Sequence, residues 1–166
     1  MTIDVRPIQP QEWQVYRELR LQALRDSPDA FGSTYEAEVT RPTESWSARI
    51  EAAIASRSDH VLLAFNHHEA SGLVWCKLAA SAPEVADIFQ MWVAPSARCQ
   101  GAGQALLRAA LDWAASVNAQ RVRLGVTATN SPAMRLYRAH GFRPIGALAP
   151  LREGTCLMVQ AMELEL

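Results

Sequence analysis

Hydrophobic and polar positions along this chain follow two periods, one typical of helices and one typical of strands. Apolar side chains recur every three or four residues in three stretches, which predict amphipathic helices at 10–25, 42–54 and 103–117. Short apolar runs predict strands at 3–8, 60–66, 72–78, 85–93, 121–126 and 156–164. The run at 85–93 is apolar on both faces, so a central strand is expected there. The pattern predicts an α/β fold, with a mixed sheet and helices on both sides.

The segment between the third helix and the last strand carries a further helix signal. Ser131 followed by Pro132 fits a helix N-cap and a proline in the first turn. Gly141 fits the left-handed residue that ends such a helix. The stretch 26–40 is rich in small and turn residues and is expected to be a loop.

A glycine-rich turn, Arg98-Cys99-Gln100-Gly101-Ala102-Gly103, joins the central strand to the helix at 103–117. Glycines let a backbone approach an anion closely, and a helix start offers unpaired N–H groups. The turn therefore predicts a site for a phosphorylated small molecule. It is not a Walker loop, because the only lysine of the chain is Lys77. It is not a dinucleotide fingerprint, because Leu106 stands where a third glycine or alanine is needed.

Two motifs that flank the glycine-rich turn narrow the class of phosphate-binding protein. Met91-Trp92-Val93-Ala94-Pro95 precedes Arg98-x-x-Gly101-x-Gly103, and this arrangement resembles the acetyl-CoA-binding motif of the GNAT family of N-acetyltransferases. The stretch Asn130-x-x-Ala133-x-x-Leu136-Tyr137-x-x-x-Gly141-Phe142 is similar to the second motif of that family. Together with their strands the two motifs cover about residues 84–145, in the family order and spacing.

The resemblance implies a single GNAT domain over residues 1–166, with a mixed, mostly antiparallel sheet splayed at its centre. It implies acetyl-CoA as cosubstrate. Backbone amides would hold its pyrophosphate at Arg98, Cys99, Gln100, Gly101, Ala102, Gly103 and Gln104. Backbone groups of Met91, Trp92 and Val93 would bind the pantetheine arm, and an amide in a bulge there would polarise the thioester carbonyl.

The second motif implies roles for Asn130 and Tyr137. Asn130 matches the family residue near the pantetheine, and its alternative role is a plain helix cap. Tyr137 matches the proposed proton donor to the departing thiolate, and its alternative role is a core aromatic. The two are seven residues apart, which on a helix would place them on the same side.

The base that deprotonates an amine acceptor has two candidates. Asp87 falls where many relatives carry a glutamate at the start of the central strand. Glu36 lies in the loop that forms one wall of the acceptor site in this fold. Phe31, Ser33, Tyr35 and Trp46 are further wall candidates by position. Either carboxylate could also be a solvated surface group.

The function predicted is an acetyl-CoA-dependent N-acetyltransferase, which moves acetyl directly to a primary amine of a small molecule, peptide or protein. The alternative is a non-catalytic domain of the same fold that binds or senses acyl-CoA. An intact glycine loop suits both functions, whereas Tyr137 favours the enzyme because a binder needs no proton donor.

The composition of the chain argues against several other classes of protein, among them nucleic-acid-binding, membrane and disulfide-bonded proteins. The 166 residues carry a net charge of −1 without a basic block, so nucleic acid is not an expected partner. No apolar run reaches the ~20 residues that span a bilayer, and the N-terminal pattern is not that of a signal peptide. Three scattered cysteines, Cys76, Cys99 and Cys156, indicate no metal site or disulfide framework, and a reducing cytoplasm is expected. A homodimer stays a hypothesis.

Overall fold

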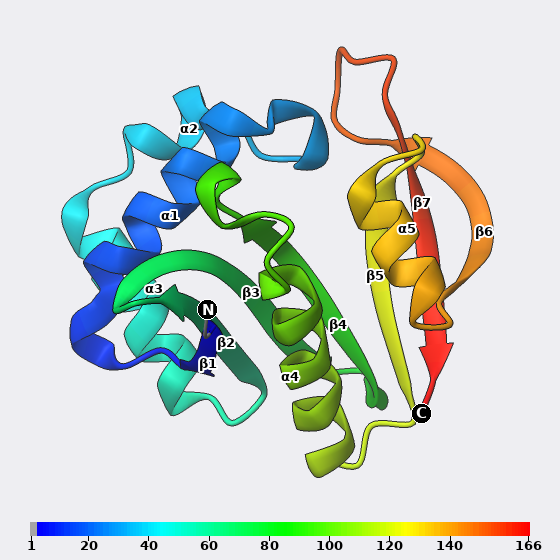
Figure 1. Cartoon of the computed structure of the whole chain (residues 1–166), viewed down its shortest axis with the longest axis horizontal. Coiled ribbons are helices and arrows are strands. Elements are labelled where there is room, and N and C mark those ends of the chain that lie inside the picture. The colour runs from blue at the N-terminus through cyan, green and yellow to red at the C-terminus, as the bar shows by residue number, and fades with distance from the viewer. Residues whose placement is uncertain (1–2) are drawn as a thin grey trace.

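In the computed structural model, which describes residues 3–166, one seven-stranded sheet runs through the molecule (Figure 1). Its order is β1-β2-β3-β4-β5-β7-β6, and every neighbouring pair is antiparallel except β4 and β5. The strands are β1 (Ile3–Pro7), β2 (Asp59–Asn66), β3 (Glu69–Ala79), β4 (Ala82–Val93), β5 (Arg121–Thr127), β6 (Arg143–Pro150) and β7 (Met158–Glu165). The predicted mixed, mostly antiparallel sheet is confirmed.

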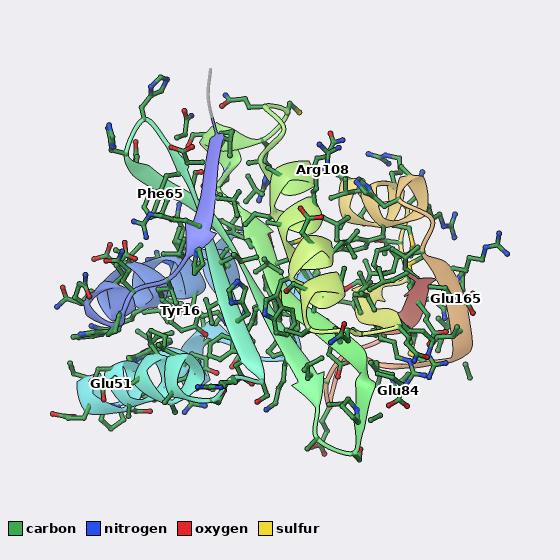
Figure 2. The ribbon with its side chains drawn as sticks, turned by 90° about the horizontal axis from the view of Figure 1, so that it is seen from below. Tyr16, Glu51, Phe65, Glu84, Arg108 and Glu165 are labelled. Carbon is green, nitrogen blue, oxygen red and sulfur yellow. The ribbon has the colours of Figure 1, made fainter. Side chains whose placement is uncertain are left out.

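Helices cover both faces of this sheet, as Figure 2 shows. The α-helices are α1 (Trp13–Asp26), α2 (Tyr35–Val39), α3 (Thr43–Ala55), α4 (Ala102–Ser116) and α5 (Pro132–Ala139). Short 3-10 turns are η1 (Pro10–Glu12), η2 (Pro28–Ala30) and η3 (Pro95–Ala97). One buried cluster joins α1 and α3 to β2 and β3. A second cluster joins α4 and α5 to strands β2 to β5 and β7.

The sheet is splayed at its centre, as predicted. The parallel ladder between β4 and β5 has only three register pairs, from Val85 with Arg121 to Asp87 with Arg123. Beyond Asp87 the two strands diverge, which Figure 1 shows between the green β4 and the yellow β5. Their backbone groups on the facing edges are then without ladder partners, so an extended ligand could pair with them.

A bulge in β4 lies just beyond the point of divergence. The register with β3 shifts between Leu73 and Trp75, and Gln90 adopts a positive φ of 57°. As a result both Phe89, which stacks on Trp75, and Gln90 face the α1 side of the sheet. The expected bulge is therefore centred one residue before Met91.

Several predicted element boundaries were wrong. The sequence pattern missed β6, because this edge strand is mostly exposed and contains two prolines and Gly146, so no apolar alternation marks it. It also missed α2 within the expected loop at 26–40. The turn between β2 and β3 is shorter than the gap between the expected strands at 60–66 and 72–78. It consists of His67 and His68, both at positive φ. The final strand begins at Met158 rather than Cys156.

Candidate active site

The glycine-rich turn gives α4 an open start. Cys99 and Gly101 have φ values of 61° and 87°, and the left-handed Gly101 is the N-cap. No described side chain caps this helix, and the first backbone bond into it is Ala105 N–H to Gly101 O, 2.9 Å long. The amides of Ala102, Gly103 and Gln104 thus have no partner within the helix and could donate to an anion, and the expected phosphate site stays a prediction.

The side chain of Arg98 turns from the helix start toward α1. Its Nη2 donates to Asp26 Oδ2 at 2.6 Å, and its Nε donates to Val93 O at 3.0 Å. Trp92 Nε1 also donates to Asp26 Oδ2, at 3.2 Å. A hydrogen bond from Ser27, together with that from Arg98, lowers the pKa of Asp26. Arg98 therefore ties the glycine turn to the end of α1.

Gly103 lies where the start of α4 meets β4 and α5. A Cβ built on it would lie 3.5 Å from Leu136 Cδ2, 3.8 Å from Met91 Cε and 3.9 Å from Val93 Cγ2. Met91 and Val93 thus lie on the α4 side of the sheet, whereas Trp92 is buried in the cluster under α1. The helix start, the bulged strand and the helix that carries Tyr137 therefore meet at Gly103.

Tyr137 is buried, at 7% exposure, in the cluster between α4 and α5. Its ring packs edge-on against Phe142, with centroids 5.9 Å apart. Burial raises the pKa of its hydroxyl to about 12. The raised pKa keeps the phenol neutral near pH 7, and no described residue hydrogen-bonds its hydroxyl.

Asn130 does not share a helix face with Tyr137, contrary to the spacing argument. The N-cap of α5 is Ser131, whose Oγ accepts from Met134 N–H at 3.1 Å. Asn130 therefore lies before the helix, exposed, and its Oδ1 accepts from Arg135 at 3.3 Å. The alternative of a plain helix cap is also wrong, because the neighbouring serine is the cap.

Asp87 lies at the last register pair before β4 and β5 separate. It alternates with Ala86 and Ile88, both buried under α4, so its side chain faces the opposite side of the sheet. Lys77 and Arg123 stand directly across from it on the neighbouring strands. Burial raises the pKa of Asp87, although both cations act to lower it.

Glu36 is placed less favourably for a role in the site. It is exposed near the start of α2 and forms no ion pair with a described residue. Glu38, two residues further on, is the buried acid of this helix and pairs with Arg41. Asp87 thus stands at the end of the ladder between β4 and β5, whereas Glu36 is an exposed carboxylate of α2.

The segment between α1 and α2 is held against the far half of the sheet. Thr127 Oγ1 donates to Asp29 O at 2.6 Å. From the loop between β6 and β7, Arg152 Nη1 donates to Pro28 O at 3.1 Å and to Phe31 O at 2.9 Å. This segment therefore crosses from the α1 side to β5 and walls one end of the space above the diverging strands.

A group that the sequence pattern treated as ordinary helix positions gathers beneath that segment. Tyr16 Oη donates to Gln90 Oε1 in the bulge at 2.7 Å. Arg20 is buried, with its guanidinium carbon 4.8 Å from the centre of the Phe31 ring. The available signal was an arginine on the apolar face of a helix, four residues after Tyr16 and four before Leu24.

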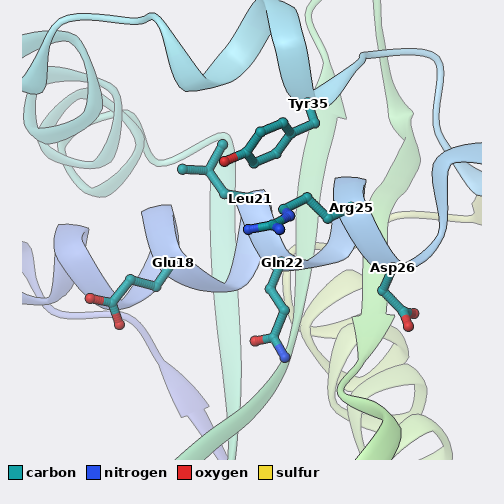
Figure 3. Close-up of a pocket in the computed structure, with 6 residues that line it drawn as sticks. All are labelled: Glu18, Leu21, Gln22, Arg25, Asp26 and Tyr35. Carbon is teal, nitrogen blue, oxygen red and sulfur yellow. The ribbon is translucent and has the colours of Figure 1, made fainter.

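A separate hollow lies along α1. It has a volume of about 510 Å³ and is lined by Glu18, Leu21, Gln22, Arg25, Asp26 and Tyr35. Figure 3 shows Tyr35 of α2 beside Leu21 and Arg25 of α1. Asp26 connects this hollow to the glycine turn through Arg98. The hollow is open and shallow, and the chemistry-bearing side chains Asp87 and Tyr137 are not in its wall.

Residues 16–142 match the sequence model of the acetyltransferase (GNAT) family, and the chain therefore belongs to that family. A mycothiol acetyltransferase from Beutenbergia cavernae is 29% identical over 133 residues, which are 79% of this chain and 41% of that protein. A streptothricin acetyltransferase from Streptomyces lavendulae is 41% identical over 63 residues, covering 38% of this chain and 33% of that protein. The chain thus spans about two fifths of the length of the first relative.

The fold agrees with that of solved acetyltransferases. A putative acetyltransferase from Salmonella typhimurium, solved with acetyl-CoA, superposes with a TM-score of 0.81 at 18% identity, over 99% of this chain and 94% of that one. Within residues 3–166 no helix has the length and apolar character needed to span a membrane. In the same range, no three His, Cys, Asp or Glu side chains gather as a metal site would need.

Gly103 allows a direct test of the donor site. Gly103→Val would fill the space between Met91, Val93 and Leu136, so acetyl-CoA affinity measured by calorimetry is expected to fall at least about tenfold, or ~1.4 kcal/mol. Gly103→Ala is the folding control, because its Cβ makes only ordinary contacts and should stabilise the helix by about 0.5–1 kcal/mol. A folded valine variant with unchanged affinity would show that the donor binds elsewhere.

Proposed function

We propose that residues 1–166 form one acetyl-CoA-dependent N-acetyltransferase unit, which transfers acetyl directly to a primary amine. The observation that carries this proposal is the convergence at Gly103. The uncapped start of α4, the bulged strand β4 and the helix of Tyr137 meet there. Family membership supports acetyl transfer, and the two named relatives differ in acceptor, so they do not select one.

The donor fits this site by its chemistry. Free amides at Ala102, Gly103 and Gln104 suit the pyrophosphate of acetyl-CoA. The diverging edges of β4 and β5 offer unpaired backbone groups to the amides of its pantetheine arm. The amide of Met91, beside the bulge, is the candidate donor to the thioester carbonyl oxygen as charge develops there.

The transfer takes two protons from the acceptor nitrogen and delivers one to the sulfur. An amine acceptor arrives mainly as its ammonium form, because an alkyl amine has a pKa of ~10.4. Asp87, on the α1 side where β4 and β5 separate, would take the first proton through a water. The neutral amine forms a bond to the acetyl carbon, the carbon–sulfur bond breaks, and Tyr137 would donate a proton to the departing sulfur. The second proton, which the nitrogen loses as the amide forms, would return to Tyr137 through solvent.

A panel of amines tests the proposal. Purified protein is given acetyl-CoA and, one at a time, amino acids, polyamines, aminoglycosides and peptides, and thiol release is followed with a chromogenic thiol reagent. At least one amine is expected to give thiol release that Tyr137→Phe suppresses. Binding of acetyl-CoA by calorimetry without turnover on any amine would instead support the non-catalytic acyl-CoA-binding function.

A further inference from the structure

The guanidinium of Arg20 is enclosed, and two of its nitrogens have no hydrogen-bond partner among the described residues. The residue lies on the inner face of α1 and is 4% exposed. Its Nε and Nη1 are buried and have no hydrogen-bond partner among the described residues. Buried donors are nearly always satisfied, and leaving one unpaired costs about 1–3 kcal/mol, more for a charged group. The unpaired donors of Arg20 therefore suggest a binding partner that would accept hydrogen bonds from them.

The protein supplies Arg20 with no counter-ion of its own. Glu38 is the one carboxylate among the described residues that raises the pKa of Arg20, and it is hydrogen-bonded to Arg41. A second cation, Arg49, acts on Arg20 from α3. Burial lowers the pKa of Arg20 as its main effect, although the group stays a cation. The cluster formed by Arg20, Arg49 and the Glu38–Arg41 pair therefore has an excess of positive charge in a largely enclosed place.

This cluster borders the candidate acceptor space. On one side is the Phe31 ring, 4.8 Å from the guanidinium carbon, in the segment that Arg152 and Thr127 hold across the sheet. On the other side is Tyr16, whose hydroxyl donates to Gln90 in the bulge of β4. Both Arg20 and Arg49 lie close enough to Tyr16 to act on the pKa of its hydroxyl, which burial raises. One tyrosine therefore separates the cations from the bulge.

We infer that Arg20, assisted by Arg49, binds a carboxylate on the acceptor, so that the acceptor is a small molecule bearing both an amine and a carboxylate. This inference rests on the proposed function. A guanidinium donates to both oxygens of a carboxylate, which would satisfy donors that the protein leaves unpaired. A carboxylate fits better than a phosphate, because a second negative charge would lie close to Glu38. The ring of Phe31, beside the guanidinium of Arg20, suits an apolar body between the charged ends of such an acceptor.

Matched amine pairs test this assignment. Each pair joins an amino carboxylate to its carboxamide, with a phosphonate analogue as a third member, at a pH corrected for the pKa of each amine. The wild-type protein is expected to favour the carboxylate at least tenfold in kcat/KM over both analogues. Arg20→Met should bring the ratio of carboxylate to carboxamide close to one, without changing acetyl-CoA affinity. Arg20→Lys should keep part of the preference.

The control is Arg25→Met, on the exposed side of the same helix, which should leave the preference as in the wild type. The inference is overturned, and Arg20 is a structural residue, if the wild-type protein does not favour the carboxylate over the carboxamide. The same conclusion follows if the Arg20→Met variant keeps that preference. A preference for the phosphonate would overturn the choice of carboxylate.

Failure of the proposed function is distinguishable from failure of this inference. If no amine is acetylated, the proposed function fails, and calorimetry of the amino carboxylates on the protein loaded with CoA then decides the anion site. Binding that Arg20→Met weakens at least tenfold would sustain the site. Binding that is absent, or equal in the two proteins, would refute it. Circular dichroism and the Tm of each variant establish that it is folded.

Discussion

Replacing Tyr137 with phenylalanine is expected to lower kcat by about 10²-fold while the affinity for acetyl-CoA stays unchanged. The ring packs against Phe142 in the cluster between α4 and α5, and the substitution keeps that packing. Only the hydroxyl is lost, and no described residue hydrogen-bonds it. A loss confined to kcat would therefore report the missing proton and not a disturbed fold.

Burial makes this proton transfer less unfavourable than the ordinary pKa values suggest. A phenol whose pKa is about 12 is a weak donor to a thiolate in water, where a thiol has a pKa of ~8.5. The same burial acts on sulfur, as Cys76 shows, because its thiol also has a pKa raised to about 12. Burial beside Tyr137 would raise the pKa of the released thiol in the same direction, which reduces the mismatch between donor and acceptor.

The measurement is steady-state and single-turnover kinetics of both proteins, with acetyl-CoA binding by calorimetry. Single-turnover data are needed to establish that chemistry limits kcat. A rate within twofold of the wild type, with chemistry limiting, would return Tyr137 to the role of a core aromatic.

Asp87→Asn is expected to lower kcat by about 10²-fold near neutral pH, because the variant cannot accept the proton of the ammonium. The loss should shrink as pH approaches the amine pKa of ~10.4, where the acceptor is deprotonated by solvent. Because the pKa of Asp87 is raised, this base is protonated at a higher pH than an ordinary aspartate when the solution is acidified. The wild-type rate should therefore begin to fall at that higher pH as the pH is lowered. The pH profiles of kcat for both proteins measure this.

The same substitution has an opposite effect on stability. Since burial raises the pKa of Asp87 in the folded state, the ionised carboxylate costs stability above that pKa. Asp87→Asn should therefore have a Tm equal to or above that of the wild type at pH 8. This advantage should vanish below the unfolded-state pKa of ~3.9, where the wild-type side chain is neutral in both states.

Glu36→Gln is the matched control, because Glu36 is exposed on α2 and should change neither kcat nor the pH profile. If instead Glu36→Gln raises the KM for the amine alone, Glu36 is the acid that binds the ammonium. If neither substitution affects the kinetics, the proton leaves by another route and the proposed role of Asp87 is wrong.

Backbone-determined features were the ones the sequence could predict. The spacing of Gly101 and Gly103 between a strand and a helix predicted the open start of α4, because only the main chain shapes such a turn. The central strand at 85–93 was equally clear, since it is apolar on both faces. The splay followed from the family resemblance, as no pattern in the strands marks where a ladder ends.

Features set by long-range side-chain contacts could not be predicted. Arg98 reaches back 72 positions to Asp26, and nothing near the glycine turn indicates that partner. Arg20 has the spacing of a core position and the chemistry of a surface residue, and its burial depends on how Phe31 and α3 close over it. The placement of Asn130, by contrast, follows from the predicted N-cap at Ser131, which puts Asn130 before the helix.

The short ladder between β4 and β5 has a consequence for the order of events at the site. Gly103, Met91 and Val93 lie on the α4 side, whereas Asp87 and Gln90 face the α1 side. Side chains next to the diverging strands therefore lie on both faces of the sheet. A donor that enters from one face and an acceptor that enters from the other do not compete for a path, so both can be bound at once. Such a layout suits a sequential mechanism through a ternary complex, in which neither product has to leave before the second substrate arrives.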